Sequence, residues 1–282
     1  MKIGLCSANG GVCARSGVLG RVAEHAEAAG FESLWVSEHL VVPDPRTPPS
    51  HMEPEAPILD PIVALAYAAA RTTTLRLGTG VVVLPLRNPL IVAKEIATLD
   101  VLSAGRVLVG IGVGYVEREF RALGVPFDHR GERTDEYLAV MRAIWTQDHP
   151  AFHGSFFDFE GVQAHPVPLQ RPHPPIVVGG WTGPALARAA AQGSGWYGWG
   201  LDRDETASVL ERLRGQVRAV DRAPALGDLE ITITPKEPVD LPSARTYAGL
   251  GVDRLNLPVG AMDEQDLLRS IDAIGTDVIG HI

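Results

Sequence analysis

Residues 75–115 constrain the fold more than any other part of the sequence. They begin with LRLGTGVVVL, an apolar, β-branched run that is typical of a strand buried on both faces of a parallel sheet. Asn88 and Pro89 then predict a helix start, because Asn can accept a hydrogen bond from an orphan backbone N–H and Pro fits the first helical position. A second apolar strand, VLVGIGVG, follows Gly105. The stretch therefore predicts a strand–helix–strand unit of a parallel sheet.

Strand-like and helix-like segments alternate through the rest of the chain. Asp60, Asp202 and Asp263 each precede a helical pattern, and we find no linker that would divide the sequence. In a chain of 282 residues, this alternation predicts one (β/α)8 TIM-barrel domain over residues 1–282, with an open doubly wound sheet as the alternative. The predicted strands are 3–7, 33–37, 75–83, 107–111, 176–179, 195–200, 229–234 and 252–257.

Charge, cysteine content and hydropathy exclude several kinds of binding site and of protein. Lys and Arg number 25 against 34 Asp and Glu, a net charge of −9, which argues against a general nucleic-acid surface. Cys6 and Cys13 match no disulfide framework or zinc spacing, and we predict no metal site. No apolar run reaches the roughly 18 residues that a membrane span requires. We therefore expect a soluble cytoplasmic protein that acts on a small molecule.

Two connections are longer than the others. Residues 40–59 carry PDPRTPPSHMEPEAP, whose proline density excludes a helix and suits a semi-rigid loop over the barrel mouth, or else a disordered surface excursion. Residues 148–175 contain FHGSFFDFEG, which predicts a short hairpin before an extended approach to the fifth strand.

The residues just after each barrel strand are the candidates for chemistry, because active sites of such barrels lie at the carboxyl ends of the strands. Glu38 and His39 follow the second predicted strand. His39 can exchange a proton with a ligand near neutral pH, and Glu38 could orient it or bind polar edges of the ligand. A purely structural histidine fits the same position.

Glycines stand at the ends of the next two strands. Gly78 and Gly80 flank Thr79, where they either relieve crowding or allow a strained or cis peptide between Gly80 and Val81 to bulge toward a flat ring.

The run from Gly110 to Tyr115 resembles a dinucleotide fingerprint, but Tyr115 stands where the third glycine is needed, so we discard the Rossmann interpretation. Gly112 and Gly114 then either serve packing or form a bare backbone wall for a planar ring beside Tyr115.

A glycine-rich turn closes the fifth strand. Gly179, Gly180 and Trp181 lead into Gly183 and Pro184, at the start of a predicted helix. Backbone N–H groups of such a turn, together with a helix N-terminus, can bind a phosphate, although similar turns also occur in loops that bind nothing.

Taken together, these segments resemble the bacterial luciferase-like monooxygenases, and within that superfamily the branch that depends on the deazaflavin coenzyme F420. The resemblance is carried by SLWVSEH, by the block from LRLGTG to EFRALG, and by PPIVVGG with the later GSGW. It extends from residue 1 to about residue 199.

The resemblance implies a barrel with a flavin or deazaflavin at its mouth and a non-prolyl cis peptide at Gly80–Val81 against the ring. It places His39 near the reactive face of the ring and implies a homodimer. We therefore predict His39 as the catalytic residue, no metal ligand, and a cofactor-binding set of Glu38, Thr79, Gly80, Val81, Gly112, Gly114, Tyr115, Gly179, Gly180 and Trp181.

The resemblance implies hydride transfer between coenzyme F420 and a small organic substrate, with reduced FMN and oxygen chemistry as the alternative and a non-catalytic flavin carrier as a further one. Tyr115 replaces the Glu of sugar-phosphate-oxidising relatives, so that activity is not expected. Glu38 is the residue found in luciferase where some F420 enzymes have Asp, which keeps FMN open. The F420 tail carboxylates would need cations, for which Arg87, Arg118 and Arg121 are candidates.

Overall fold

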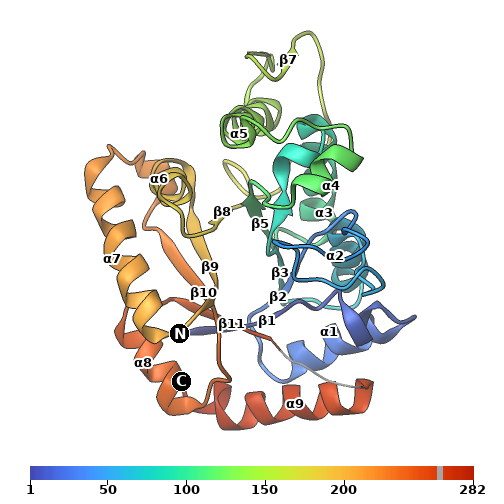
Figure 1. Cartoon of the computed structure of the whole chain (residues 1–282), viewed down its shortest axis with the longest axis vertical. Coiled ribbons are helices and arrows are strands. Elements are labelled where there is room, and N and C mark those ends of the chain that lie inside the picture. Colours follow the sequence, from blue (N-terminus) through green and yellow to red (C-terminus); the bar gives the residue numbers. More distant parts are fainter. Residues whose placement is uncertain (259–262) are drawn as a thin grey trace.

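The chain folds as a closed parallel barrel surrounded by helices (Figure 1). The structure is a computed structural model that describes residues 1–258 and 263–282. Its strands follow the order β3-β2-β1-β11-β10-β9-β8-β5, and β3 also pairs with β5, which closes the ring. The predicted (β/α)8 barrel is thus confirmed, and the open doubly wound sheet is excluded.

All eight predicted strands form, and the third is divided into two short pieces, β3 and β4. The interruption falls at Gly80–Val81, where the peptide bond is cis, as the resemblance implied. The strands are β1 (Lys2–Cys6), β2 (Ser33–Val36), β3 (Arg76–Thr79), β4 (Val82–Val83), β5 (Val107–Gly112), β8 (Ile176–Gly179), β9 (Gly195–Leu201), β10 (Glu230–Pro235) and β11 (Arg254–Pro258).

Helix starts follow the predicted caps. Asp60 and Asn88 each accept hydrogen bonds from first-turn N–H groups, and Asp202 forms a capping box with Glu205. Helices α4 and α8 were not predicted. The helices are α1 (Val18–Ala28), α2 (Pro61–Ala69), α3 (Pro89–Leu102), α4 (Glu117–Ala122), α5 (Arg130–Thr146), α6 (Gly183–Gln192), α7 (Arg203–Ala219), α8 (Leu241–Gly249) and α9 (Glu264–Asp277).

Most of the core lies between the barrel and its helices, and a second, smaller cluster fills the barrel. Inside, the Trp35 and Tyr197 rings pack with centroids 5.6 Å apart. A Cβ at Gly78 would lie 2.3 Å from the Trp35 ring, so this glycine gives the indole its space. The barrel interior is therefore packed rather than hollow.

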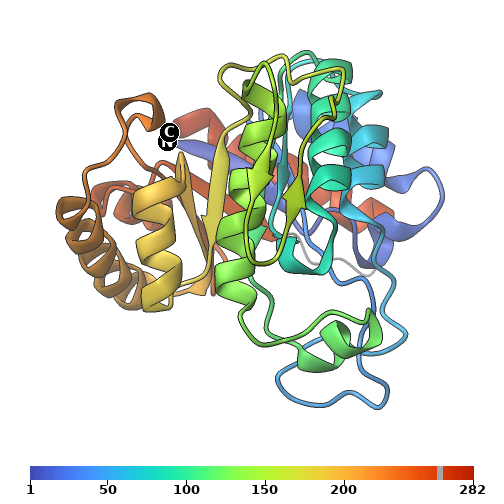
Figure 2. The same cartoon turned by 90° about the horizontal axis from the view of Figure 1, so that it is seen from above.

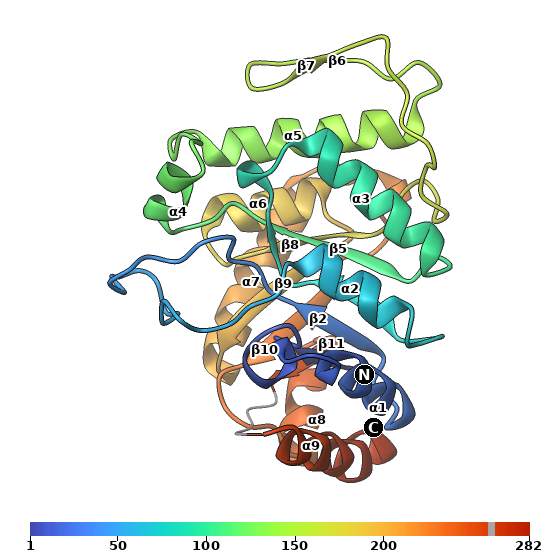
Figure 3. The ribbon, with the colours of Figure 1, turned by 90° about the vertical axis from the view of Figure 1, so that its right-hand side faces the viewer.

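The two long connections take the predicted forms. Strands β6 (Phe152–His153) and β7 (Asp158–Phe159) pair as a short antiparallel hairpin, which lies beside α5 in Figure 3. The proline-rich loop contains no regular element, and it projects next to α4 in Figures 2 and 3. None of the helices in the described ranges has the length and apolar character needed to cross a membrane.

A partly exposed carboxylate fixes the start of β3. Glu27 on α1 accepts hydrogen bonds from the backbone N–H groups of Thr73, Thr74 and Leu75, at 2.9, 2.6 and 2.8 Å. Burial alone would raise the pKa of Glu27, but these donors lower it to about 2. The pKa of Glu27 in the folded protein thus lies below its ordinary value near 4.3. The ionised Glu27 therefore contributes fully to stability above about pH 4.3, and this contribution disappears as the pH falls toward 2.

We expect Glu27→Gln to lower the free energy of unfolding by about 1 kcal/mol at pH 7, because a charge-assisted acceptor is lost. The difference from wild type should shrink between pH 4.3 and 2, as measured by urea unfolding. Glu211→Gln, which changes an exposed carboxylate on α7, should have little effect at either pH. An equal loss at pH 7 and pH 2 would contradict this role of the Glu27 charge.

Candidate functional site

The predicted site residues gather on one side of the barrel rim. His39 follows β2, Gly80 and Val81 follow β3, Gly112 and Tyr115 lie at or after the end of β5, and Gly179 ends β8. These four strands are consecutive neighbours and run parallel, so their carboxyl ends form a continuous arc. The fold thus brings together residues that are up to 140 positions apart in the sequence.

The corner between β3 and β4 is anchored on both sides. The Gly80 N–H donates to the Val36 carbonyl at 2.6 Å, and the fully buried Thr79 hydroxyl donates to the Gly110 carbonyl at 2.7 Å. Val81 lies half-buried on top of the cluster that fills the barrel. We call the segment Thr79, Gly80 and Val81 the Val81 corner.

The neighbouring glycines make room for this corner. A Cβ at Gly112 would lie 2.7 Å from Val81 Cγ2, and a Cβ at Gly179 would lie 2.8 Å from Val81 Cγ1. At Gly110 the added atom would lie 1.8 Å from the Thr79 carbonyl oxygen. Gly110 and Gly112 thus serve packing, one of the two predicted roles, and the Val81 side chain stands between Gly112 and Gly179.

Gly114 has a similar packing role one step further along the chain. Its φ of +76° suits glycine, and a Cβ there would lie 2.6 Å from Val83 Cγ1 and 2.7 Å from Phe120.

The buried carboxylate of Glu119 holds His39. Nδ1 of His39 lies 3.1 Å from Glu119 Oε2, and Glu119 Oε1 accepts a hydrogen bond from the Leu40 N–H at 2.7 Å. Only 12% of the His39 side chain and 2% of the Glu119 side chain are exposed. Because an ionised carboxylate only accepts hydrogen bonds, the proton of a neutral imidazole lies on Nδ1. Among the residues that the structure describes, Nε2 has no hydrogen-bond partner, so it can exchange a proton with a ligand.

Tyr115 stands beside this pair. Its ring packs edge to face against the His39 ring, with the two centroids 5.9 Å apart. The centroid of the His51 ring, from the proline-rich loop, lies 6.3 Å from that of Tyr115. Burial, followed by the negative charge of Glu119, raises the pKa of Tyr115. The phenol therefore stays protonated near neutral pH and can donate a hydrogen bond.

Glu119 was missed in the sequence because it lies on a short helix that we did not predict. Its signal is an acidic residue on an otherwise apolar face, since Val116, Glu119 and Phe120 are all buried and are spaced by three and four residues. A carboxylate at such a position needs a polar partner, and His39 supplies it.

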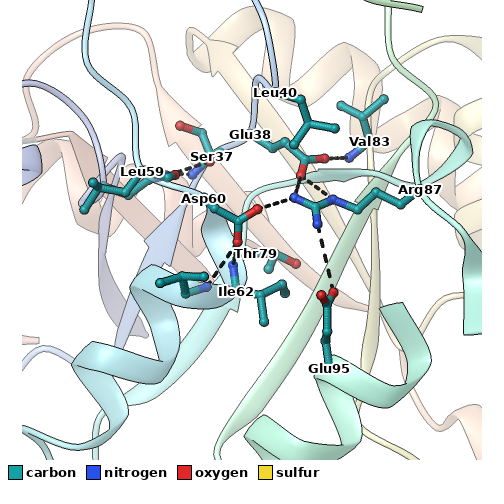
Figure 4. Close-up of polar contacts among 12 residues, drawn as sticks. Ser37, Glu38, Leu40, Leu59, Asp60, Ile62, Thr79, Val83, Arg87 and Glu95 are labelled. Carbon is teal, nitrogen blue, oxygen red and sulfur yellow. Dashed lines mark hydrogen bonds and ion pairs between the residues drawn. The ribbon is translucent and has the colours of Figure 1, made fainter. Parts of the chain in front are cut away.

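The buried Glu38 carboxylate belongs to a network of charged side chains around Arg87 (Figure 4). Glu38 accepts hydrogen bonds from the Val83 N–H at 2.6 Å and from Arg87 Nε at 2.7 Å. Arg87 also donates to Asp60 Oδ2 at 2.6 Å, and Asp60 caps α2. The network ties β2 to β4 and to the starts of α2 and α3.

Burial raises the pKa of Glu38, although Arg87 and the Val83 N–H oppose that shift. The pKa of Asp60 is lowered instead. Burial would raise it, but Arg87 and the N–H groups at the start of α2 have the larger, opposite effect. Arg87 is engaged by these carboxylates, so the structure does not support it as a partner for a cofactor tail. Arg118 is exposed, and Arg121 pairs with Glu117 at 2.9 Å.

The N-terminus of α6 is open to a ligand. Thr182 makes no capping hydrogen bond, the first turn contains no acidic residue, and a Cβ at Gly183 would meet nothing within 4 Å. Gly180, with φ +103°, and the exposed Trp181 precede this turn. Unpaired N–H groups at a helix start are the donors that a phosphate needs.

No metal site accompanies these groups in the part of the chain that the structure describes, where no three His, Cys, Asp or Glu side chains gather around a common point.

We expect Arg87→Met to lower the free energy of unfolding by about 3 kcal/mol, because Glu38 would be left buried without its cation. Adding Glu38→Gln to Arg87→Met should restore part of this loss. Arg121→Met, which removes an exposed cation, should cost less than about 1 kcal/mol. Urea unfolding at pH 7 measures all three, and similar losses for Arg87→Met and Arg121→Met would contradict the role of the network.

Comparisons with known proteins identify the family of the chain. The family model described as luciferase-like monooxygenase matches residues 10–239. An uncharacterized protein of Mycobacterium tuberculosis is 35% identical over 201 residues, which cover 68% of this chain and 69% of that protein.

Relatives with named activities use two different cofactors. The F420-dependent glucose-6-phosphate dehydrogenase of Kineococcus radiotolerans is 31% identical over 225 residues, which cover 77% of this chain and 63% of that enzyme. The FMNH2-dependent dimethylsulfone monooxygenase of Pseudomonas putida is 41% identical over 113 residues, which cover 39% of this chain and 31% of that enzyme.

Solved structures share the whole fold. Monooxygenase RslO1 from Streptomyces bottropensis has a TM-score of 0.75 at 24% identity, with 100% of this chain and 99% of that chain covered. An F420-dependent secondary alcohol dehydrogenase has a TM-score of 0.78 at 18% identity, with 99% and 98% covered. With a closed barrel, a cis peptide at Gly80–Val81 and a family match over most of its length, the chain belongs to the luciferase-like monooxygenase family of flavin- and F420-dependent oxidoreductases.

Proposed function

We propose that this protein is a coenzyme F420-dependent oxidoreductase that transfers a hydride between the deazaflavin and a small organic substrate. The observation that carries the proposal is the His39–Glu119 pair, which lies at the end of β2 on the same arc of the rim as the Val81 corner. This pair provides a proton-exchanging nitrogen, Nε2, beside a surface that suits a flat ring.

The residues at the rim fit such a cofactor. The half-buried Val81 side chain offers a support for a planar ring, and the open N-terminus of α6 offers N–H groups for a phosphate. Of the cations considered for the tail carboxylates, Arg118 and Arg121 are exposed on α4. We infer that Val81, Gly180 and Trp181 contact the cofactor.

A deazaflavin, when bound, supplies a two-electron carrier that reacts poorly with oxygen. The chain's own contribution is orientation and proton handling. Glu119 fixes the His39 ring and its tautomer, Nε2 exchanges the proton with the substrate, and the Tyr115 hydroxyl can donate a hydrogen bond to a substrate oxygen.

Reduced FMN is the second candidate cofactor, with oxygen chemistry in place of hydride transfer. It is favoured by the 41% identity to the FMNH2-dependent enzyme of P. putida over the matched segment. That segment is short, whereas the similarity to an F420-dependent enzyme extends over 77% of this chain, so we place F420 first. A cytoplasmic homodimer that acts on a small organic molecule remains a prediction.

Parallel titrations of the purified apo-protein with coenzyme F420 and with FMN, each oxidised and reduced and followed by fluorescence, test the cofactor. We expect F420 to bind at least about tenfold more tightly than FMN. Preference for reduced FMN would support the second candidate, and binding of neither would contradict both.

We expect His39→Ala to lower turnover by about 100-fold or more, and Glu119→Gln by about tenfold, because the first loses the proton-exchanging group and the second only its orientation. Glu117→Gln on the same helix, which alters an exposed carboxylate, is the matched control and should retain activity. Cofactor affinity should stay within about threefold in all three variants. Unchanged turnover in His39→Ala would remove this residue from the mechanism.

A further inference from the structure

Three neighbouring strands of the barrel end beside an exposed aromatic side chain. Tyr115 follows β5, Trp181 follows β8, and Trp199 lies near the end of β9, with exposed fractions of 46%, 51% and 58%. A large aromatic ring in water forgoes the stabilisation that burial would give it, so three such rings at one rim indicate a surface for a ligand. Tyr115 and Trp181 belong to the predicted site, whereas Trp199 has no role so far.

Trp199 points into the mouth of the barrel. Along β9, Trp196 packs outward into the core beneath the helices, and Tyr197 packs inward against Trp35. Because side chains alternate between the two faces of a strand, Trp199 shares the inward side with Tyr197, one layer nearer the rim.

A bulge at Gly200 ends the run of inward-facing side chains on β9 at Trp199. Thr234 of β10 pairs with Trp199, but the next residue, Pro235, pairs with Leu201, so Gly200 is left without a partner. Gly200 has φ +68°, which glycine adopts without steric cost. Leu201 is thereby returned to the buried outer core, and Trp199 is the last inward side chain of the strand.

The position of β9 places Trp199 across the mouth from His39. In the closed ring of eight strands, β9 is separated from β2 by three strands in each direction, so the ends of these two strands are opposite one another. Tyr197, directly below Trp199, also reaches the Val81 corner, since a Cβ at Gly80 would lie 3.1 Å from Tyr197 Cε1. A molecule held at His39 above the corner therefore meets the indole on its far side.

We propose that Trp199 is a specificity-determining residue, whose indole forms the wall of the substrate site opposite His39 and selects molecules with a flat, uncharged ring. An indole face gains contact area and stacking with another ring but offers nothing to a buried charge. The proposal deepens the proposed function by naming its substrate class. It rests on the proposed function, and titrations with and without the cofactor distinguish the failure of one from the failure of the other.

Calorimetric titration with 2-naphthol and cyclohexanol tests the wall, using the protein with and without its bound cofactor. We expect 2-naphthol to bind more tightly than cyclohexanol, and Trp199→Ala to weaken 2-naphthol binding about tenfold while Trp199→Phe weakens it about threefold. Leu102→Ala is the control, because Leu102 is 70% exposed at the end of α3, next to the amino ends of the strands. This control should bind 2-naphthol as wild type does.

The proposal is overturned if Trp199→Ala binds 2-naphthol as tightly as Leu102→Ala, or if wild type shows no preference for 2-naphthol over cyclohexanol. If no flavin or deazaflavin binds but 2-naphthol binding still depends on Trp199, the wall is supported and the proposed function fails. If a cofactor binds and Trp199→Ala leaves 2-naphthol binding unchanged, only the proposed role of Trp199 is contradicted.

Discussion

The packing of Val81 against glycines of two neighbouring strands is the constraint on which the site depends. Val81 can stand at the rim only because Gly112 and Gly179 lack side chains, and the chain can turn there only because Gly110 admits the Thr79 carbonyl. Any side chain at these glycines would push against backbone or a branched side chain, neither of which can yield cheaply. The corner also divides the third predicted strand into β3 and β4.

Two buried glutamates, Glu38 and Glu119, lie near the rim and have different roles. Glu38 accepts the Val83 N–H and pairs with Arg87, which fixes the chain after the corner. Glu119 accepts hydrogen bonds from His39 and from the backbone that follows it, which fixes the His39 ring and the beginning of the proline-rich loop. The carboxylate of Glu38, which has a structural role, thus directly precedes in the sequence the histidine that the Glu119 carboxylate holds.

Local signals predicted much of the fold. The strands could be located because they are apolar on both faces, and the starts of α2, α3 and α7 because Asp60, Asn88 and Asp202 supply caps to their own helices. Helix α8 carries the same kind of signal, an Asp240 cap followed by Pro242, which the sequence prediction missed, whereas α4 lacks one. The six residues of α4 follow Val116, which makes no side-chain capping bond, and their stability depends on packing against the loop and His39.

By itself, the sequence determined the barrel and the arc of candidate residues at the strand ends, because periodicity, caps and strand order act over short distances or through one repeating unit. The family was indicated by the resemblance of its motifs. Only the tertiary structure decided which glutamate holds His39, that the glycines accommodate Val81, and that Trp199 faces His39 across the mouth. These depend on pairs such as Glu119 with His39, 80 positions apart, and on a bulge that a single glycine introduces. Contacts of this kind arise from closure of the ring and leave no periodic trace in the chain.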